Sequence, residues 1–405
     1  MSDLSGYDKN SQIDTQLLII KKQNSKEGLD ILPLMDEFII YEDLFQNAIS
    51  ARLIFRDQVN LVGSMPIVGG ELVSISYKTP LYSEVVSLDF IVYQIAERGL
   101  SNTNENIQIN QLMLCTPEVW FAANNNAESG YSGTYVDIIE RMLRETGTKK
   151  KLTKEDSVGI VQYASPQLNV FKSIKFCASR ANSKTQSPMF FWETPSGYHI
   201  KSLKEIYRAT QYKFLYIEDR GTAGADRSGD KVFNTAFSFD YPASNNRLAQ
   251  YSANAFGADN LSVDFTNKRI SKNSNSYDDV FHKADIKLNK FPLNDDAKAI
   301  RNASGYIPYR TDLSHLNEFN RLCTTMLMDN VSLIVNIPGD SKLEVGAIVW
   351  LEIPAKVALE IGSEAHTSGK WLVRSIKHLI QKTTYSMICE LTKDSFDSDV
   401  NIGGK

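Results

Sequence analysis

The residues that could do chemistry in this 405-residue chain are scattered, and the motif nearest to a phosphate-binding loop is incomplete. Such a loop needs a glycine, four residues and then Gly-Lys-Ser or Gly-Lys-Thr, because its amides wrap the phosphates and its hydroxyl reaches magnesium. Between Gly362 and Gly369-Lys370 there are six residues, and Trp371 stands where the hydroxyl is needed. We interpret this segment as a turn that enters a strand.

Nucleophilic and acid–base catalysis also lack a matching pattern. A nucleophile elbow has the form Gly-x-Ser-x-Gly, whereas Ser132 in Gly130-Tyr131-Ser132-Gly133 has its second glycine one residue too early. A glycosidase pair of carboxylates is set by distance in space, so counting acids does not decide the matter. The adjacent acids lie in polar stretches typical of solvated turns: Asp36-Glu37, Glu42-Asp43, Asp278-Asp279 and Asp295-Asp296.

The histidines and cysteines show no metal-ligand spacing. The histidines are His199, His282, His315, His366 and His378. The cysteines lie far apart within apolar patterns, which favours buried free thiols in a reducing compartment; they are Cys115, Cys177, Cys323 and Cys389. A disulfide would require the fold to bring two of them together. We therefore expect no catalytic, cofactor-binding or metal-binding residues, no cofactor, and a protein that is not an enzyme.

Aromatic residues and net charge indicate packing rather than nucleic-acid binding. Trp120-Phe121, Phe190-Phe191-Trp192 and Trp350 could form a platform for bases or sugars, but cores and subunit interfaces use such residues more often. The net charge of -4 argues against a dedicated nucleic-acid binder. The chain starts without a basic segment and has no run near the ~20 apolar residues of a membrane span, which predicts no signal peptide and no stable membrane association.

The strongest signal is a strand pattern that occurs twice, about 280 residues apart. Its apolar positions alternate with mostly polar ones, which predicts half-buried strands; they are Ile49, Ala51, Leu53 and Phe55, then Val331, Leu333, Val335 and Ile337. Each copy resumes after a glycine, at Gly70 or Gly346, and two more predicted strands follow. This repetition suggests an internal duplication of a small β-module, which usually serves architecture rather than catalysis.

The elements around the duplication predict an α+β fold rich in β-structure. Strand patterns at 17–21, 36–41, 49–56, 72–78, 85–96 and 107–115, with a short helical turn at 60–65, predict a barrel-like unit over residues 13–116. Residues 117–208 are predicted to form an α+β middle domain with strands at 189–192 and 198–200. Thr134 or Ser132 could cap its first helix, Gly147 suits the end, and Ser165-Pro166 is predicted to begin its second helix.

The second β-barrel is predicted to be discontinuous, over residues 209–275 and 310–395. Strands are expected at 213–217, 232–239, 248–256 and 261–265, and a helix at 313–327. A mobile loop is expected at 219–230. Residues 271–276 and the insert at 276–309 are expected to be irregular, and the tail at 396–405 to be disordered.

Segments in both halves resemble the central baseplate hub protein of contractile-tailed (myovirus) phages. Residues 339–346, 368–378 and 385–394 are similar to the end of that family, and residues 49–57 and 66–76 to its opening barrel. The segment at 166–181, the strand Phe190-Phe191-Trp192-Glu193 and residues 198–203 also match its order. The resemblance covers about residues 15 to 395 and extends to the hub part of type VI secretion spike proteins.

The resemblance implies a structural, trimeric hub. In that family three chains form a ring, and two tube-type β-barrels per chain make a collar with pseudo-six-fold symmetry that joins the six-fold tail tube to the three-fold central spike. It implies a central channel that DNA crosses only in transit, and a place in the virion tail baseplate after assembly in the host bacterial cytoplasm. Only eleven residues follow Asp394, so we expect the spike to be a separate chain. The implied partners are a spike protein of the OB-fold needle or tail-lysozyme type, a tail tube or tube-initiator protein, and baseplate wedge proteins.

Two other interpretations stay open. The first is the hub of a tailocin or another contractile injection system, which neighbouring genes for a capsid and terminase would distinguish from a phage hub. The second belongs to another class: a carbohydrate-active enzyme or glycan-binding module that uses the aromatic residues of the middle domain. Glycan hydrolysis that is abolished by changing one carboxylate would establish it.

Overall fold

The computed structural model describes residues 12–23, 25, 27–58, 61–80, 82–101, 104–127, 130–185, 187–217, 234–242, 246–252, 255–264, 268–276, 287–292, 306–310, 315–353 and 368–396. Several predictions lie outside these residues: the loop at 219–230, most of the insert at 276–309 and the tail beyond Phe396. The same holds for Gly362, His282, His366, Asp278-Asp279 and Asp295-Asp296.

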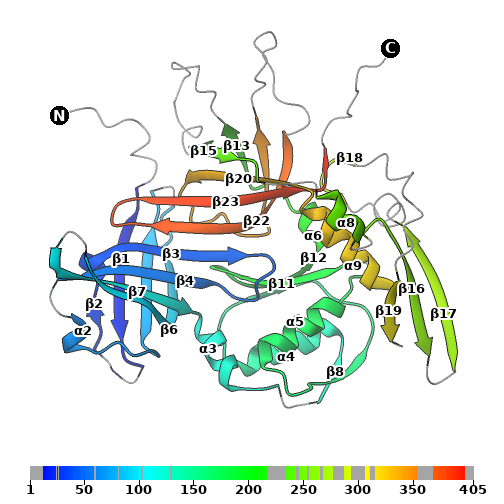
Figure 1. Cartoon of the computed structure of the whole chain (residues 1–405), viewed down its shortest axis with the longest axis horizontal. Helices are drawn as coiled ribbons and strands as arrows, with labels where there is room; N and C mark the ends of the chain where they lie inside the picture. Colours follow the sequence, from blue (N-terminus) through cyan, green and yellow to red (C-terminus); the bar gives the residue numbers. More distant parts are fainter. Residues whose placement is uncertain are drawn as a thin grey trace, which may run out of the picture.

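The first β-module consists of antiparallel strands that curl around an apolar core (Figure 1). Its strands are β1 (Asp14–Lys21), β2 (Leu29–Asp30), β3 (Met35–Asp43), β4 (Ser50–Asp57), β5 (Leu72–Lys78), β6 (Val86–Ser101) and β7 (Asn104–Cys115). Every second residue of β4 points inward, so Ala51, Leu53 and Phe55 are buried. The strands predicted between residues 17 and 115 are confirmed, and the short helix is α2 (Leu61–Ser64).

The middle block, residues 117–208, packs two helices against a small sheet and has its own apolar cluster. Its helices are α3 (Pro117–Asn124), α4 (Tyr135–Glu145), α5 (Val170–Arg180) and α6 (Leu203–Arg208). Its strands are β8 (Gly130–Gly133), β9 (Leu152–Lys154), β10 (Val161–Ala164), β11 (Met189–Thr194) and β12 (Gly197–Ser202). In Figure 1 this block lies below the large sheet, with α4 and α5 side by side.

The ends of the two long helices test the predicted caps. Thr134 begins α4 through a capping box with Asp137, and Gly147 follows its end with φ +73°, so both of these predictions are confirmed. The predicted start of the second helix at Ser165-Pro166 is wrong. Gln167 has φ +57°, which no helix residue adopts, and the side chain of Asn169 accepts a hydrogen bond from Lys172 N, so α5 begins at Val170.

The second β-module is assembled from separate segments. Its strands are β13 (Lys213–Ile217), β14 (Thr235–Ala236), β15 (Ser238–Asp240), β20 (Val331–Pro338), β21 (Ile348–Glu352), β22 (Gly369–Ile380) and β23 (Tyr385–Lys393). The predicted helix before it is α9 (His315–Met328). Beside these elements lie α8 (Arg247–Ser252), β16 (Gly257–Asp264), β17 (Arg269–Ser276), β18 (Phe291–Pro292), β19 (Tyr306–Arg310) and β24 (Ser395–Phe396).

Three predictions for this part of the chain are wrong. Residues 248–252 were expected in a strand but belong to α8, where the side chain of Asn246 accepts a hydrogen bond from Ala249 N in the first turn. Residues 271–276 were expected to be irregular but belong to β17. Their backbone groups pair with β16, and this pairing does not require apolar side chains. Short strands also occur in the predicted irregular insert and at Phe396, where β18 pairs with β24.

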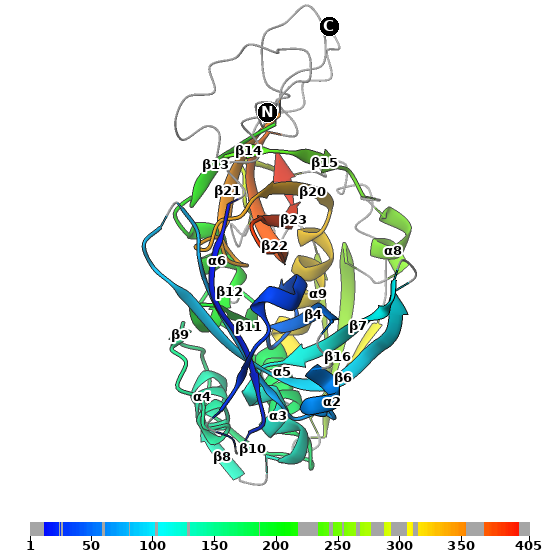
Figure 2. The same cartoon turned by 90° about the vertical axis from the view of Figure 1, so that its left-hand side faces the viewer.

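The two modules are joined into one sheet. Strand β22 of the second module pairs antiparallel with β3 of the first, so among the described residues a single 14-stranded sheet runs through both. Figure 2 shows this from the side, with the second module above the first. One apolar cluster likewise includes Phe55 and Leu114 of the first module and Val335 and Leu391 of the second. The fold is therefore rich in β-structure with an α+β middle block, as the sequence predicted.

Candidate assembly interface

The two modules share one strand order, which confirms the duplication seen in the sequence. In the first module the neighbours are β4, β7, β6 and β5, all antiparallel. In the second module they are β20, β23, β22 and β21, also antiparallel. Ala51 pairs with Leu114 as Leu333 pairs with Leu391, and Leu53 pairs with Leu112 as Val335 pairs with Cys389. Each strand of one copy therefore has a counterpart in the same register.

Two irregular positions also occur in both copies. Both long strands carry an extra residue at the same place, Tyr93 in β6 and Arg374 in β22, where the pairing register shifts. The register of β6 shifts again between Ile95 and Glu97, which makes Ala96 a second extra residue of that strand. The glycine before the neighbouring strand donates its amide to the residue just before the shared extra one: Gly70 N to Val92 O at 2.7 Å, and Gly346 N to Val373 O at 2.9 Å.

These two glycines have the same left-handed backbone, with φ +89° at Gly70 and +87° at Gly346. A tryptophan from the middle block covers each one. An added Cβ would lie 3.7 Å from Trp120 Cζ2 at Gly70 and 2.9 Å from Trp192 Cζ2 at Gly346. Only glycine adopts this backbone without strain, so the two positions have the same structural requirement. The sequence located both glycines but gave no sign of the tryptophans that cover them.

The junction between the modules is an antiparallel strand pair with a buried polar chain. It runs from Ser375 opposite Asp43 to Ile380 opposite Phe38. His378 lies in it, with Nε2 2.7 Å from Glu42 Oε1 and Nδ1 2.7 Å from Tyr385 Oη. Only 2% of His378 and of Glu42 is exposed. The prediction that Glu42 lies in a solvated turn is therefore wrong, because its partner is 336 residues away and only the fold brings the two together.

The middle block is fastened to the first module by a buried acid. Glu193 Oε2 accepts a hydrogen bond from Ile49 N at 3.0 Å, and its other oxygen lies 2.5 Å from Lys150 Nζ, which also binds Glu118 at 2.9 Å. Burial raises the pKa of Glu193 to about 7 although the Lys150 ammonium acts in the opposite direction. Glu193 therefore holds the residue just before β4 in place through this hydrogen bond.

A second contact fastens the middle block to the other module and includes a serine, a histidine and a glutamate beside a cavity of about 430 Å³. Ser196 Oγ lies 3.3 Å from His199 Nε2 and donates to Glu344 Oε2 at 2.8 Å, and Ser196 N donates to Glu344 Oε1. In a catalytic triad the carboxylate binds the histidine, whereas here it binds the serine. Burial and nearby lysines lower the pKa of His199 to about 4. The group is therefore suited to holding a turn, not to acyl transfer.

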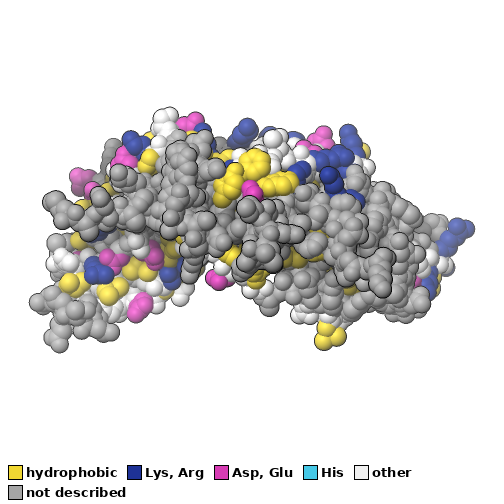
Figure 3. Space-filling view, turned by 90° about the horizontal axis from the view of Figure 1, so that it is seen from above, with side chains coloured by type: hydrophobic (Ala, Val, Ile, Leu, Met, Phe, Trp, Pro, Cys, Tyr) yellow, Lys and Arg dark blue, Asp and Glu magenta, His cyan; other side chains and the backbone are white. Residues whose placement is uncertain are grey.

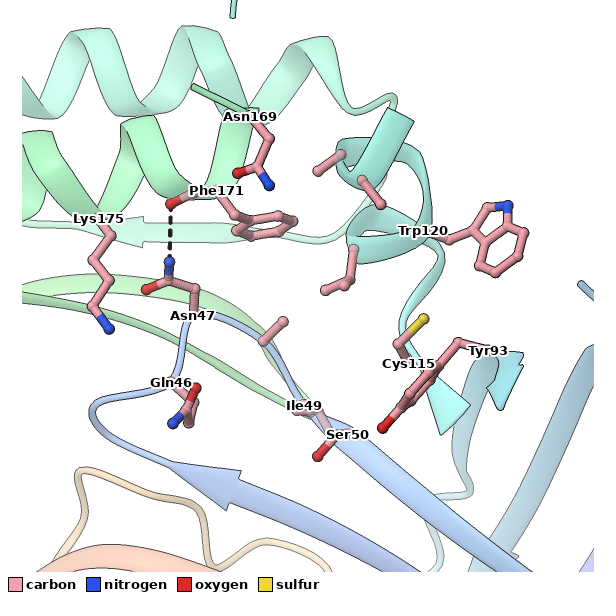
Figure 4. A pocket seen from close by; sticks show the side chains of 14 residues that line it. Gln46, Asn47, Ile49, Ser50, Tyr93, Cys115, Trp120, Asn169, Phe171 and Lys175 are labelled. Carbon is pink, nitrogen blue, oxygen red and sulfur yellow. Dashed lines mark hydrogen bonds between the residues drawn. The ribbon is translucent and has the colours of Figure 1, made fainter. Parts of the chain in front are cut away.

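A second cavity, of about 540 Å³, lies between the first module and helices α3 and α5 (Figure 4). Tyr93 and Trp120 lie along one side and Phe171 and Lys175 along another, and Asn47 Nδ2 donates to Phe171 O at 3.0 Å. The described residues that line it include no carboxylate and no histidine. These residues therefore offer no pair of carboxyl groups of the kind that glycoside hydrolysis uses.

The remaining sequence candidates have structural surroundings. Phe190, Phe191 and Trp192 are buried, and Trp350 lies beside Phe214. The four cysteines are buried and free, as predicted, and burial raises the thiol pKa of Cys177 and Cys389 to about 12. Ser132 is an exposed residue of β8, Asp36 binds Arg56, and His315 begins α9.

Within the described ranges, no group of three or more His, Cys, Asp or Glu could hold a metal ion. None of the described helices is long and apolar enough to cross a bilayer.

Apolar side chains also reach the surface on the opposite side from the middle block. Figure 3 views the molecule from above, the side on which β13 and β15 lie in Figure 1, and shows apolar atoms near its centre. Phe214 of β13 is 50% exposed, and Tyr241, just after β15, is 46% exposed. Large exposed aromatic residues beside strand edges are typical of surfaces that other chains cover.

Comparison with known proteins agrees with this architecture. No protein-family model matches the chain. Over 70 residues it is 39% identical to the probable baseplate hub protein gp334 of Vibrio phage KVP40, a match that spans 17% of this chain and 16% of that protein. The tail protein from Neisseria meningitidis MC58 has a TM-score of 0.59 at 10% identity, covering 93% of this chain and 96% of the other.

Two further solved structures share the fold. The 43 kDa tail protein of prophage MuSo2 from Shewanella oneidensis has a TM-score of 0.58 at 10% identity, covering 94% of this chain and 99% of the other. A chain of the lidded Francisella PdpA–VgrG complex has a TM-score of 0.51 at 9% identity, covering 97% of this chain and 56% of the other. At these identities the likeness concerns the fold. The chain is thus similar in part to a baseplate hub protein and has the fold of phage tail proteins, as the sequence resemblance predicted.

Proposed function

We propose that this chain is a non-enzymatic structural hub of a contractile phage tail. In this proposal three copies form a ring in the virion baseplate, between the six-fold tail tube and the three-fold central spike, and DNA crosses the ring through a central channel. The likeness to a probable baseplate hub protein and to tail proteins supports this assignment.

The observation that carries the proposal is the duplication with its shared strand order. A six-fold ring offers six equal contacts, and three chains can meet them only if each chain presents two similar surfaces. The two modules of this chain have matching strands, extra residues and left-handed glycines. Their surroundings differ, because β13 runs parallel to β21 whereas β1 runs antiparallel to β5. Such near-equivalence suits contacts with a six-fold tube on one side and a three-fold spike on the other.

The mass of the purified protein tests the proposal. We expect light scattering to give three times the 45.5 kDa of one chain, and the spike protein of the same genome to elute with it in equal numbers of chains. A second run with the tail tube protein should give a larger complex. Spike and tube proteins analysed alone are the controls. A monomer that binds neither of them at micromolar concentration would contradict the proposal.

A further inference from the structure

We propose that the open edge of β6, residues 94–99, pairs antiparallel with β15 of a second copy of this chain. This contact would repeat between two chains the contact that β22 and β3 make within one chain. The inference rests on the proposed ring and identifies the strand edges and the register that would close it.

Strand β6 has an open edge beyond its pairing with β5. Strand β5 pairs with β6 only from Val86 to Ile91, and β7 lies on the opposite edge. Beyond Ile91 no described strand pairs with the β5 side of β6, and the side chains of Gln94, Glu97 and Arg98 are exposed. In β22 the corresponding stretch, residues 375–379, is covered by β3; the stretch of β6 is one residue longer because Ala96 is an extra residue. The first module therefore has an open edge where the second module has a bound strand, and an open edge is a template for another chain.

Strand β15 occupies in the second module the place that β3 occupies in the first. Strand β3 lies next to β4, with Phe38 opposite Leu53, and β15 lies next to β20, with Phe239 opposite Val335. Leu53 and Val335 are counterparts, and both pairs are antiparallel, so β15 holds in the second module the position that β3 holds in the first. The partner that fits the open edge of β6 is therefore β15, supplied by another copy.

The register of the contact follows from the residues that β3 and β22 place opposite each other. Ile40 of β3 lies opposite His378, whose partner in β23 is Met387. The counterpart of His378 is Arg98, because Arg98 pairs with Asn110 and Asn110 lies opposite Phe55 as Met387 lies opposite Ile337. Counting from Phe239, the counterpart of Ile40 is Tyr241. Arg98 of one chain would then face Tyr241 of the next, and Gly99 would face Asp240.

The side chains at these positions are compatible with the contact. Arg98 is exposed although its Nε donates to Asn110 Oδ1 at 3.2 Å. Tyr241, whose ring meets that of Phe239 edge-on, is 46% exposed, so a guanidinium group can approach the outer part of the phenol ring. A Cβ added at Gly99 would have no atom of its own chain within 4 Å, so there is room at this position for Asp240 of the second copy. Tyr93, the extra residue just before the open edge, also lines the cavity of about 540 Å³.

Such a contact is head-to-tail and closes into a ring. Each chain offers one β6 edge and one β15, so contacts between chains alternate with the β3–β22 contacts inside chains. The ring contains two modules for each chain, which gives six modules from three chains.

Paired cysteines test the register. A disulfide requires Cα atoms about 4.4–6.8 Å apart, a distance met by residues directly opposite each other in an antiparallel pair. The matched double variants are Arg98→Cys with Tyr241→Cys, and Gly99→Cys with Asp240→Cys. The mismatched controls combine the same four changes, Arg98→Cys with Asp240→Cys and Gly99→Cys with Tyr241→Cys, and place the two thiols on opposite faces of the sheet. The four native cysteines are buried and stay in all variants.

After mild oxidation we expect the matched variants to run as covalent dimers and trimers on a non-reducing gel, at least five times more abundantly than the mismatched controls. Reductant should restore the single chain. Because every cysteine occurs in one matched and one mismatched variant, a folding defect affects both. Equal cross-linking in all four variants, or none in particles with the mass of a trimer, would overturn the register and leave the proposed hub intact. A protein that stays monomeric would overturn both.

Discussion

At the scale of single residues, Asp394 ties the end of β23 to a distant segment. It is 3% exposed, and its Oδ1 accepts hydrogen bonds from Leu288 N at 3.1 Å and from Ser395 Oγ at 2.7 Å. Burial raises the pKa of this carboxyl to about 6, although the hydrogen bonds act in the opposite direction. The folded protein therefore keeps this proton at pH values where the unfolded chain, with a pKa near ~3.9, has lost it.

The sign of the resulting pH dependence follows from that difference. The stabilisation due to the Asp394 proton is complete below about pH 4 and is lost as the pH rises through about 6. A shift of about two units corresponds to roughly 3 kcal/mol. We expect the free energy of unfolding, measured in urea, to be lower at pH 7.5 than at pH 4. In Asp394→Asn this decrease should be smaller by roughly 3 kcal/mol. Identical pH profiles for the two proteins would contradict this assignment.

At the scale of elements, helix α4 depends on its capping box. Thr134 Oγ1 accepts from Asp137 N, and Asp137 Oδ2 accepts from Thr134 N, so two free amides of the first turn are satisfied. We expect Thr134→Ala to lower the free energy of unfolding by about 1 kcal/mol. Ser132→Ala is the matched control, because Ser132 is exposed and joins β10 through its backbone. Thermal unfolding of both variants checks the prediction, and an equal loss from the two would refute it.

Some helices and strands could be predicted from the sequence and others could not. The β-strands of both modules follow from the period of two, since one buried face forces alternation at Leu53 or Val335. Helix α8 and strand β17 did not follow, because polar residues such as those from Arg269 to Ser276 carry no alternation and pair through backbone groups alone. The start of α4 was predictable because Thr134 pairs with Asp137, only three residues away. The start of α5 was not, because the left-handed backbone of Gln167 keeps the residues before it out of the helix.

The candidate interface was predictable only in outline. The duplication and its two glycines can be read from the sequence, because they depend on residues close together in the chain. The buried pair of Glu42 and His378 and the covering Trp192 cannot, because their partners are 336 and more than 150 residues away. The open edge of β6 is likewise a property of the sheet, since it depends on where β5 ends its pairing.

At the scale of the whole molecule, the two modules share one sheet and one apolar cluster, which also includes Trp192 and Leu203 of the middle block, whereas helices α4 and α5 pack in a second cluster. Cooperative unfolding follows shared burial, so a loss of packing in one module should loosen the other. Leu114 and Leu391 are counterparts in β7 and β23, and each is fully buried in the shared cluster. We expect Leu114→Ala and Leu391→Ala each to cost roughly 2–5 kcal/mol.

Hydrogen exchange measured on peptides separates this coupling from local damage. In Leu114→Ala, the amides of β20 and β23 should exchange faster by about the same factor as those of β4 and β6, although they lie in the other module. Ile138→Ala, which removes a buried side chain from the middle cluster, is the control and should accelerate exchange mainly in α4 and α5. Protection that is lost in one module alone would mean that the β3–β22 junction does not couple the two. Coupling across that junction is what a ring of alternating internal and external contacts requires, because each module must hold its edge in place for the next chain.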